Sequence, residues 1–218
     1  MNASELLAKV DHTLLKPTAT WEEIDECAEE AQKYHTATVV VPSSYVRDIR
    51  NSYHDMVRIC TVVGFPLGYT NTTGKIAEAG QALADGASEI DMVINIGSLK
   101  GGDTNYVTEE IRQIKELCGE RILKVIVEAC LLTEEEKIAA CHCVKEAHAD
   151  FIKTSTGFSK GGATLEDVEL FKKHIGSKVK IKAAGGIRTR EDMEAFLAAG
   201  CERLGMSAAI HILRNELQ

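Results

Sequence analysis

The chain has 218 residues, of which 44% are hydrophobic and 27% charged, so it can bury a substantial core and is neither an intrinsically disordered chain nor a disulfide-stapled miniprotein. Lys and Arg number 25 against 33 Asp and Glu, and the formal net charge of -8 argues against a surface that binds nucleic acid. A small phosphorylated ligand stays compatible with this charge, since a pocket of backbone amides binds an anion locally.

Short β-branched runs alternate with amphipathic helical patterns along the chain. The predicted strands are Val10–Leu14, Thr38–Val41, Val57–Val63, Glu89–Ile94, Leu123–Glu128, Phe151–Thr154, Val179–Ala183 and Arg203–Met206. The predicted helices are Met1–Lys9, Trp21–Lys33, Thr72–Asp85, Asn105–Leu117, Glu134–Ala147, Thr164–His174, Arg190–Ala198 and Ala208–Leu217, with a less distinct helical segment in Pro42–Met56. This order predicts a (β/α)₈ TIM barrel with an extra N-terminal helix, in preference to an open doubly wound sheet.

Neither a linker-like tract nor a targeting segment is evident in the sequence. We therefore expect residues 1–218 to form a single domain, and the absence of a long uncharged run predicts a cytoplasmic protein without a membrane partner. The seven cysteines are interpreted as reduced thiols.

Three predicted strands carry an ionisable residue in apolar surroundings, namely Asp91, Lys153 and Lys182. Both lysines precede a glycine turn by a few residues, which places them near the carboxyl ends of strands, where barrel enzymes build their active sites. On neighbouring strands they are about 4.8 Å apart plus side-chain reach, and repulsion with desolvation lowers the pKa of at least one of them. A neutral lysine attacks carbonyl carbons, and a carboxylate such as Asp91 can move the protons of aldol chemistry.

The alternative for any single strand lysine is that its ammonium group extends to solvent. We interpret Lys124, at the start of its predicted strand, and Lys180 in this way, and expect Lys124 at the amino-terminal face of the barrel, away from the chemistry.

Glycine and serine follow the last strands, where barrel loops frequently bind phosphate. The candidates are Gly157, Gly185, Gly186, Gly205 and Ser207, with Arg188 as a source of charge. The alternative is that these glycines only make tight turns.

The sequence Cys141-His142-Cys143 with His148 is the strongest metal candidate, but residues two apart on a helix do not face one another. Neither a dinucleotide fingerprint nor a phosphate-loop motif is present, so we expect no metal and no organic cofactor.

Five segments carry a family resemblance, and their order and spacing cover most of the chain. They are Asp11–Pro17, Gly64–Gly68, Glu89–Asn95, Phe151–Gly157 and Lys182–Arg188. In these segments the chain resembles the deoxyribose-phosphate aldolase family.

The resemblance implies a metal-independent class I aldolase on a (β/α)₈ barrel, which reversibly cleaves 2-deoxy-D-ribose 5-phosphate into acetaldehyde and D-glyceraldehyde 3-phosphate. It also implies that Lys153 forms the Schiff base, that Lys182 perturbs it and assists proton transfer, that Asp91 relays protons through water, and that Asp11 is the acid beside the second lysine. The glycines named above and Ser207 match positions around the substrate phosphate.

One departure is that Phe158 occupies a place where some members of the family have a lysine, and Lys160 follows two positions later. We expect the reaction to be unchanged and the phosphate to be held mainly by backbone amides and by Arg188 or Lys160. Glu128 and Cys130 are expected near the mouth of the barrel, with loop packing and solvent contact as the favoured interpretation. The alternative functions are a non-catalytic sugar-phosphate-binding barrel and a metal-dependent aldolase. A homodimer is the default expectation for the assembly.

Overall fold

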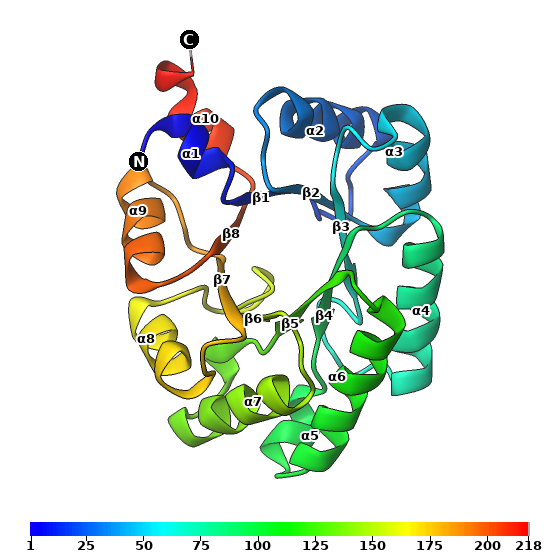
Figure 1. Ribbon diagram of the computed structural model, residues 1–218, viewed down its shortest axis with the longest axis vertical. Helices are drawn as coiled ribbons and strands as arrows, with labels where there is room; N and C mark the ends of the chain where they lie inside the picture. Colours follow the sequence, from blue (N-terminus) through cyan, green and yellow to red (C-terminus); the bar gives the residue numbers. More distant parts are fainter. Residues whose placement is uncertain (218) are drawn as a thin grey trace.

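Eight parallel strands close into a barrel in the computed structural model, which describes residues 1–217 (Figure 1). The strands are β1 (Val10–Thr13), β2 (Thr38–Val41), β3 (Ile59–Val63), β4 (Glu89–Val93), β5 (Ile122–Ile126), β6 (Phe151–Lys153), β7 (Lys180–Ala184) and β8 (Arg203–Met206). Each strand pairs with the next along the chain, and β1 also pairs with β8, with Asp11 opposite Gly205. The predicted (β/α)₈ barrel is confirmed, with each strand within two residues of its expected bounds.

The helices form a ring outside the strands, as Figure 1 shows. They are α1 (Ala3–Leu7), α2 (Trp21–Lys33), α3 (Val46–Tyr53), α4 (Thr72–Ala84), α5 (Ile96–Lys100), α6 (Thr104–Cys118), α7 (Glu134–Glu146), α8 (Leu165–His174), α9 (Arg190–Ala199) and α10 (Ala209–Leu213), with short 3₁₀ turns η1 (Ser43–Tyr45), η2 (Ala129–Leu131) and η3 (Arg214–Glu216). The extra N-terminal helix is present but shorter than expected. The predicted closing helix is divided into α10 and η3, and α5 was not predicted.

Local sequence fixes where the longer helices begin. Thr20 and Thr133 each accept a hydrogen bond from the backbone of a glutamate three residues later, and that glutamate returns one to the threonine backbone. These reciprocal bonds satisfy amide groups that the first helical turn leaves unpaired. The buried residues of α2, Ile24, Cys27, Ala28 and Ala31, recur at helical spacing and pack toward the sheet.

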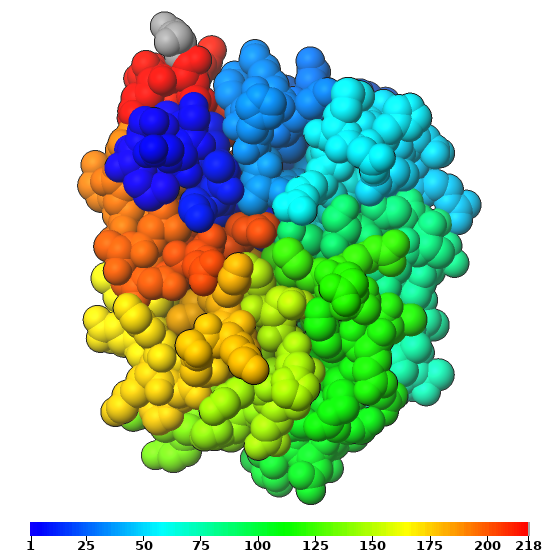
Figure 2. Space-filling model, in the orientation of Figure 1, coloured from blue at the N-terminus to red at the C-terminus, as the bar shows by residue number. Residues whose placement is uncertain are grey.

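Strand residues alternate between the helix layer and the barrel interior. In β4, Ile90 and Met92 belong to the large apolar core beneath the helices, whereas Glu89 and Asp91 face the other way. Atoms fill the centre of the molecule in the space-filling view, where the ribbon alone leaves an opening (Figure 2). The interior is therefore a packed layer of side chains, as in other barrels of this size.

None of the helices within residues 1–217 combines the length and the apolar composition that a membrane span requires.

Candidate active site

The interior of the barrel holds a network of buried ion pairs. It joins three carboxylates to four basic side chains: Asp11, Glu89 and Asp91 with Lys124, Lys153, Lys182 and Arg203. Six of these residues are buried, and Arg203 is half-buried, with a side chain that is 11% exposed. Buried charges are retained only when they are paired in this way, so the sequence places them here for a reason beyond packing.

Asp91 lies between the two lysines that the sequence singled out. Its Oδ2 atom is 2.8 Å from Lys153 Nζ and 2.7 Å from Lys182 Nζ. The two lysines are directly opposite each other on β6 and β7, and Lys182 also donates to Oδ2 of Asp11. The structure thus brings together all four predicted catalytic residues.

The two lysines have opposite pKa shifts. Burial lowers the pKa of Lys153, and the Lys182 ammonium adds to this effect, while Asp91 opposes it. For Lys182, burial has the same sign, but Asp11 and Asp91 together raise its pKa. The environment therefore favours a neutral amine at Lys153 and a retained ammonium at Lys182.

The two aspartates of this network, Asp11 and Asp91, both have a lowered pKa and stay ionised. Although burial alone would raise the pKa of the Asp91 carboxyl, the surrounding ammonium groups, first that of Lys124, hold it well below its usual range. Lys124 itself keeps its proton, because burial is outweighed by Asp91 and the other carboxylates, which raise its pKa.

Lys124 does not lie where the sequence placed it. It was expected at the amino-terminal face, but it is fully buried inside the barrel, 2.7 Å from Asp91 Oδ1 and 2.6 Å from Glu89 Oε2. The reason is its register: Lys124 is directly opposite Asp91 and faces the same side of the sheet. Lys180, by contrast, is exposed beside Glu202, as expected.

A pocket of about 370 Å³ opens above Lys153 at the carboxyl ends of the strands; we call it the reactive pocket. Lys153 is the one member of the buried network that lines it, and Lys182, Asp91 and Asp11 lie beneath. The other lining residues are Thr13, Leu14, Leu15, Lys16, Thr156, Gly157, Phe158, Ala184, Gly185, Gly186, Ile187, Gly205, Met206, Ser207 and Ala208.

All four glycines predicted around a phosphate, and Ser207, line the reactive pocket. Gly157, Gly185 and Gly186 have φ angles of +84°, +78° and +81°, a conformation that side chains disfavour. A Cβ on Gly185 would also approach Cα of Gly162 to 3.2 Å. The backbone conformation of this part of the lining therefore depends on glycine.

The two basic residues proposed to hold phosphate are placed differently. Arg188 is exposed and does not line the reactive pocket, and its backbone amide donates to Asp192 Oδ2 at 2.9 Å. Lys160 is also exposed and outside the lining.

Glu128 was expected to combine loop packing with solvent contact; the loop packing is present, but the expected solvent contact is wrong. It is 2% exposed with φ of 53°, and its carboxylate accepts hydrogen bonds from the backbone and the hydroxyl of Thr156. Since Thr156 lines the reactive pocket, Glu128 supports the loop that follows β6. Cys130 is half-buried, with Sγ 3.5 Å from Ser159 Oγ.

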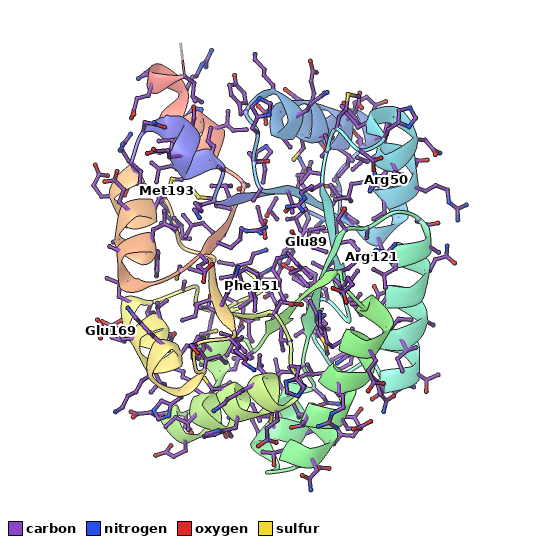
Figure 3. The ribbon with its side chains drawn as sticks, viewed as in Figure 1. Arg50, Glu89, Arg121, Phe151, Glu169 and Met193 are labelled. Atoms are coloured by element: carbon purple, nitrogen blue, oxygen red, sulfur yellow. The ribbon has the colours of Figure 1, made fainter. Side chains whose placement is uncertain are left out.

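Sequence reasoning missed Lys124, Glu89 and Arg203 as parts of the buried network. Figure 3 labels Glu89 and Phe151 toward the middle of the barrel, and Glu169 and Met193 on the surrounding helices. The guanidinium of Arg203 lies 5.6 Å from the centre of the Phe151 ring. The signal was the period of two along each strand, which places Glu89 on the same side as Asp91.

Of the residues considered as metal ligands, Cys141, His142 and Cys143 lie on α7, where both cysteines are buried, and His148 follows the end of this helix. Within residues 1–217, three or more Cys, His, Asp or Glu side chains do not converge in a geometry that would hold a metal ion.

Comparisons with known proteins show which family and which solved structures the chain resembles. Residues 6–217 match the family model described as DeoC/LacD family aldolase. The chain is 60% identical to a deoxyribose-phosphate aldolase from Clostridium botulinum (strain Alaska E43 / Type E3), over 99% of this chain and 98% of that protein. Among solved structures, an aldolase called QR15 superposes with a TM-score of 0.93 at 38% identity and covers 98% of this chain and 96% of its own. A deoxyribose phosphate aldolase from Aeropyrum pernix, described as tetrameric, superposes with a TM-score of 0.91 at 30% identity, over 98% and 92% of the two chains.

Proposed function

This chain belongs to the DeoC/LacD aldolase family, and we propose that its buried lysine pair carries out the reaction of a class I deoxyribose-phosphate aldolase. That reaction is the reversible cleavage of 2-deoxy-D-ribose 5-phosphate to acetaldehyde and D-glyceraldehyde 3-phosphate. The observation that carries the assignment of roles is the position of Lys153: it lines the reactive pocket, its pKa is lowered, and it shares one carboxylate oxygen with Lys182.

The reaction begins when the neutral Nζ of Lys153 attacks C1 of the open-chain sugar and water leaves, which forms an imine. The imine draws the electrons of the C2–C3 bond as the C3 hydroxyl loses its proton, and D-glyceraldehyde 3-phosphate departs. The enamine that stays on Lys153 is then protonated at C2, and water releases acetaldehyde. Each step needs a proton donor or acceptor near the nitrogen.

Lys182 and Asp91 supply this proton chemistry from below the pocket. Lys182 keeps a proton, and Asp91 Oδ2 bridges it to Lys153, so a proton can pass between the two amines through a chain of short hydrogen bonds. Asp11 holds Lys182 from its other side and keeps it charged. Asp91 does not line the reactive pocket but contacts the reacting nitrogen, so we assign it as the catalytic carboxylate; Asp11 contacts only Lys182 of the two amines and is a positioning residue.

The phosphate end of the substrate is proposed to lie against the backbone of the β6, β7 and β8 loops. Gly157, Gly185, Gly186 and Gly205 bring their amides close to the pocket, and Ser207 adds a hydroxyl donor. Arg188, which is exposed, contributes long-range charge to this end rather than a contact.

Borohydride reduction in the presence of acetaldehyde tests this assignment, because an imine on lysine is reduced to a stable ethyl adduct. Peptide mass mapping is expected to find the adduct on Lys153, while Lys182 and the buried Lys75 serve as internal controls. Folded protein that binds deoxyribose 5-phosphate without an adduct or acetaldehyde release would instead support the alternative, a non-catalytic sugar-phosphate-binding barrel.

The location, domain organisation and assembly of the protein are proposed as well. We propose that the protein acts in the cytoplasm as one domain and as a homo-oligomer, with a homodimer as the default. Size-exclusion chromatography with light scattering tests the assembly, for which the tetrameric relative provides a second reference.

A further inference from the structure

A second pocket, of about 540 Å³, adjoins the reactive pocket; we call it the side pocket. It lies over the loops that follow β1, β2 and β3, whereas the phosphate end of the reactive pocket lies over those that follow β6, β7 and β8. Leu15, Lys16 and Phe158 line both pockets. The two spaces are therefore continuous parts of one mouth above Lys153.

The walls of the side pocket are mainly apolar. Its remaining lining residues are Pro17, Ala19, Pro42, Ser43, Ser44, Tyr45, Val62, Phe65, Pro66 and Glu78. The charged groups among the lining residues are already engaged: Lys16 Nζ lies 2.5 Å from Glu23 Oε1, and Glu78 accepts a hydrogen bond of 2.8 Å from the backbone of Gly64. The side pocket thus suits an uncharged hydrocarbon group better than a phosphate.

Two aromatic rings mark the boundary between the pockets. Phe158 is 51% exposed, and its ring meets that of Phe65 edge to face, with centroids 5.2 Å apart and planes at 83°. This arrangement is favourable for aromatic pairs and joins the β6 loop to the β3 loop. An exposed ring held in this geometry offers its free surface to whatever enters the mouth.

The floor of the side pocket reaches the buried network. Val62 is directly opposite Asp91 in the β3–β4 register, and it packs with Val40 and Cys60 inside the barrel. Cys60 Sγ lies 3.2 Å from Asp91 Oδ1. A group in contact with Val62 is thus close to the catalytic carboxylate, which lies on the neighbouring strand directly opposite Val62.

We propose that the side pocket binds the apolar substituent of an unphosphorylated acceptor aldehyde, and that Phe65 and Phe158 determine this specificity. The proposal rests on the proposed function, because the acceptor must react with an enamine on Lys153. Phosphorylated acceptors extend toward the glycine loops, and apolar acceptors extend toward β1–β3.

The step is an aldol addition. Lys153 Nζ condenses with acetaldehyde and water leaves; the resulting imine takes up a proton at nitrogen, loses a proton from its methyl carbon and becomes an enamine. The enamine carbon bonds to the carbonyl carbon of the acceptor as the acceptor oxygen takes up a proton. Water then cleaves the imine, which releases a 3-hydroxyaldehyde and restores the amine of Lys153.

The experiment measures kcat/KM for addition of acetaldehyde to two acceptors, D-glyceraldehyde 3-phosphate and 3-phenylpropanal. Ser43→Phe and Ser44→Phe fill the side pocket from its outer wall, and Ser43→Ala and Ser44→Ala are the matched controls. At least one Phe variant is expected to lower kcat/KM for 3-phenylpropanal by about tenfold or more. The value for D-glyceraldehyde 3-phosphate is expected to change by no more than about twofold, as for a surface substitution.

Three outcomes overturn the side-pocket proposal while the proposed function stands. The first is that the wild-type protein uses D-glyceraldehyde 3-phosphate but not 3-phenylpropanal. The second is that neither Phe variant changes kcat/KM for 3-phenylpropanal. The third is that the Phe variants lower kcat/KM equally for both acceptors. A wild-type protein that does not turn over D-glyceraldehyde 3-phosphate contradicts the proposed function itself.

Discussion

Lys124 Nζ lies 2.7 Å from Oδ1 of Asp91, while Lys153 and Lys182 both meet the other oxygen of the same carboxylate. Three basic groups therefore share one anion. The ammonium group of Lys124 offsets part of the negative charge of Asp91. The carboxylate therefore stabilises a proton on Lys153 less strongly. We therefore expect Lys124, which does not line the reactive pocket, to favour the neutral form of Lys153.

The charge balance of the barrel interior leads to the same conclusion. With every group ionised, the network has four positive and three negative charges. An unpaired positive charge in a buried network is energetically costly. The group that most readily loses a proton is Lys153, the single lysine of this network whose pKa is lowered. With Lys153 neutral, the charges are equal.

Replacing Lys124 by Met is expected to raise the pKa of Lys153, because Asp91 then has one cation fewer. The acidic limb of the pH profile of kcat/KM should move to higher pH, and each unit of movement lowers the rate below that limb about tenfold. The free energy of unfolding should also fall, by about 3–5 kcal/mol, as when a buried pair loses one partner. Rate profiles and urea unfolding measure the two effects.

Lys75→Met is the matched control. Lys75 is also fully buried and lies 2.9 Å from its partner Glu110, but it stands outside the network, between α4 and α6. Its removal should destabilise the fold to a similar degree without moving the pH profile. If the two variants lose activity alike with unshifted profiles, Lys124 has only a structural role.

The effect of the Lys182 charge on the pKa of Lys153 can be tested with one variant that removes the charge and one that keeps it. Lys182→Met removes an ammonium group that lowers the pKa of Lys153, so the acidic limb should move to higher pH and kcat/KM at pH 7 should fall by about 10²-fold or more. Lys182→Arg keeps the charge and should leave the limb closer to its wild-type position. An unchanged limb in Lys182→Met would show that burial alone sets the pKa of Lys153.

The lowered pKa of Lys153 also predicts how stability depends on pH. At pH values between the folded pKa and the ordinary value of 10.5, the unfolded chain binds more protons at this site than the folded chain. This group therefore opposes folding at neutral pH, and its penalty disappears as the pH rises through 10.5. Lys153→Met removes the penalty, while Asp91 keeps Lys124 and Lys182 as partners.

The free energy of unfolding of Lys153→Met, minus that of the wild type, is accordingly expected to be larger at pH 7 than at pH 10. Denaturant unfolding at several pH values measures it. A difference that stays constant with pH would mean that Lys153 has an ordinary pKa in the folded protein.

The fold was predictable because each strand and helix has its own local signal. The β-branched runs and the helical spacing located all eight strands, and the lysines near glycine turns indicated the reactive face. These features depend on residues close in sequence, so composition and period were sufficient. Helix α5, five residues long after β4, has too short a pattern to be recognised in this way.

The errors concern side chains whose surroundings come from distant strands. Lys124 was expected at solvent because its position in the strand was judged alone, yet its burial depends on Asp91 and Glu89 from β4. Glu128 was assigned to a solvated loop because its partner, Thr156, is on another loop. A lone charged residue in a strand therefore needs its facing partners to be considered before its exposure is predicted.

The contact between Glu128 and Thr156 gives the last prediction. Glu128 has a left-handed backbone, and its carboxylate holds both the amide and the hydroxyl of Thr156, a lining residue of the reactive pocket. Glu128→Ala is expected to loosen this loop and to raise KM for deoxyribose 5-phosphate by about tenfold, with a smaller change in kcat, since a bond to a buried charged group is worth about 1.5–3 kcal/mol. Thr156→Val should have a similar effect.

The double variant distinguishes this mechanism from general damage to the loop. If Glu128 acts through Thr156, the two substitutions together should raise KM little more than either alone, because the second removes an interaction already lost. Steady-state kinetics of the three variants, with borohydride labelling of Lys153 as a check that the nucleophile is intact, decide the matter. Effects on KM that multiply in the double variant would show that Glu128 and Thr156 act on the reactive pocket independently.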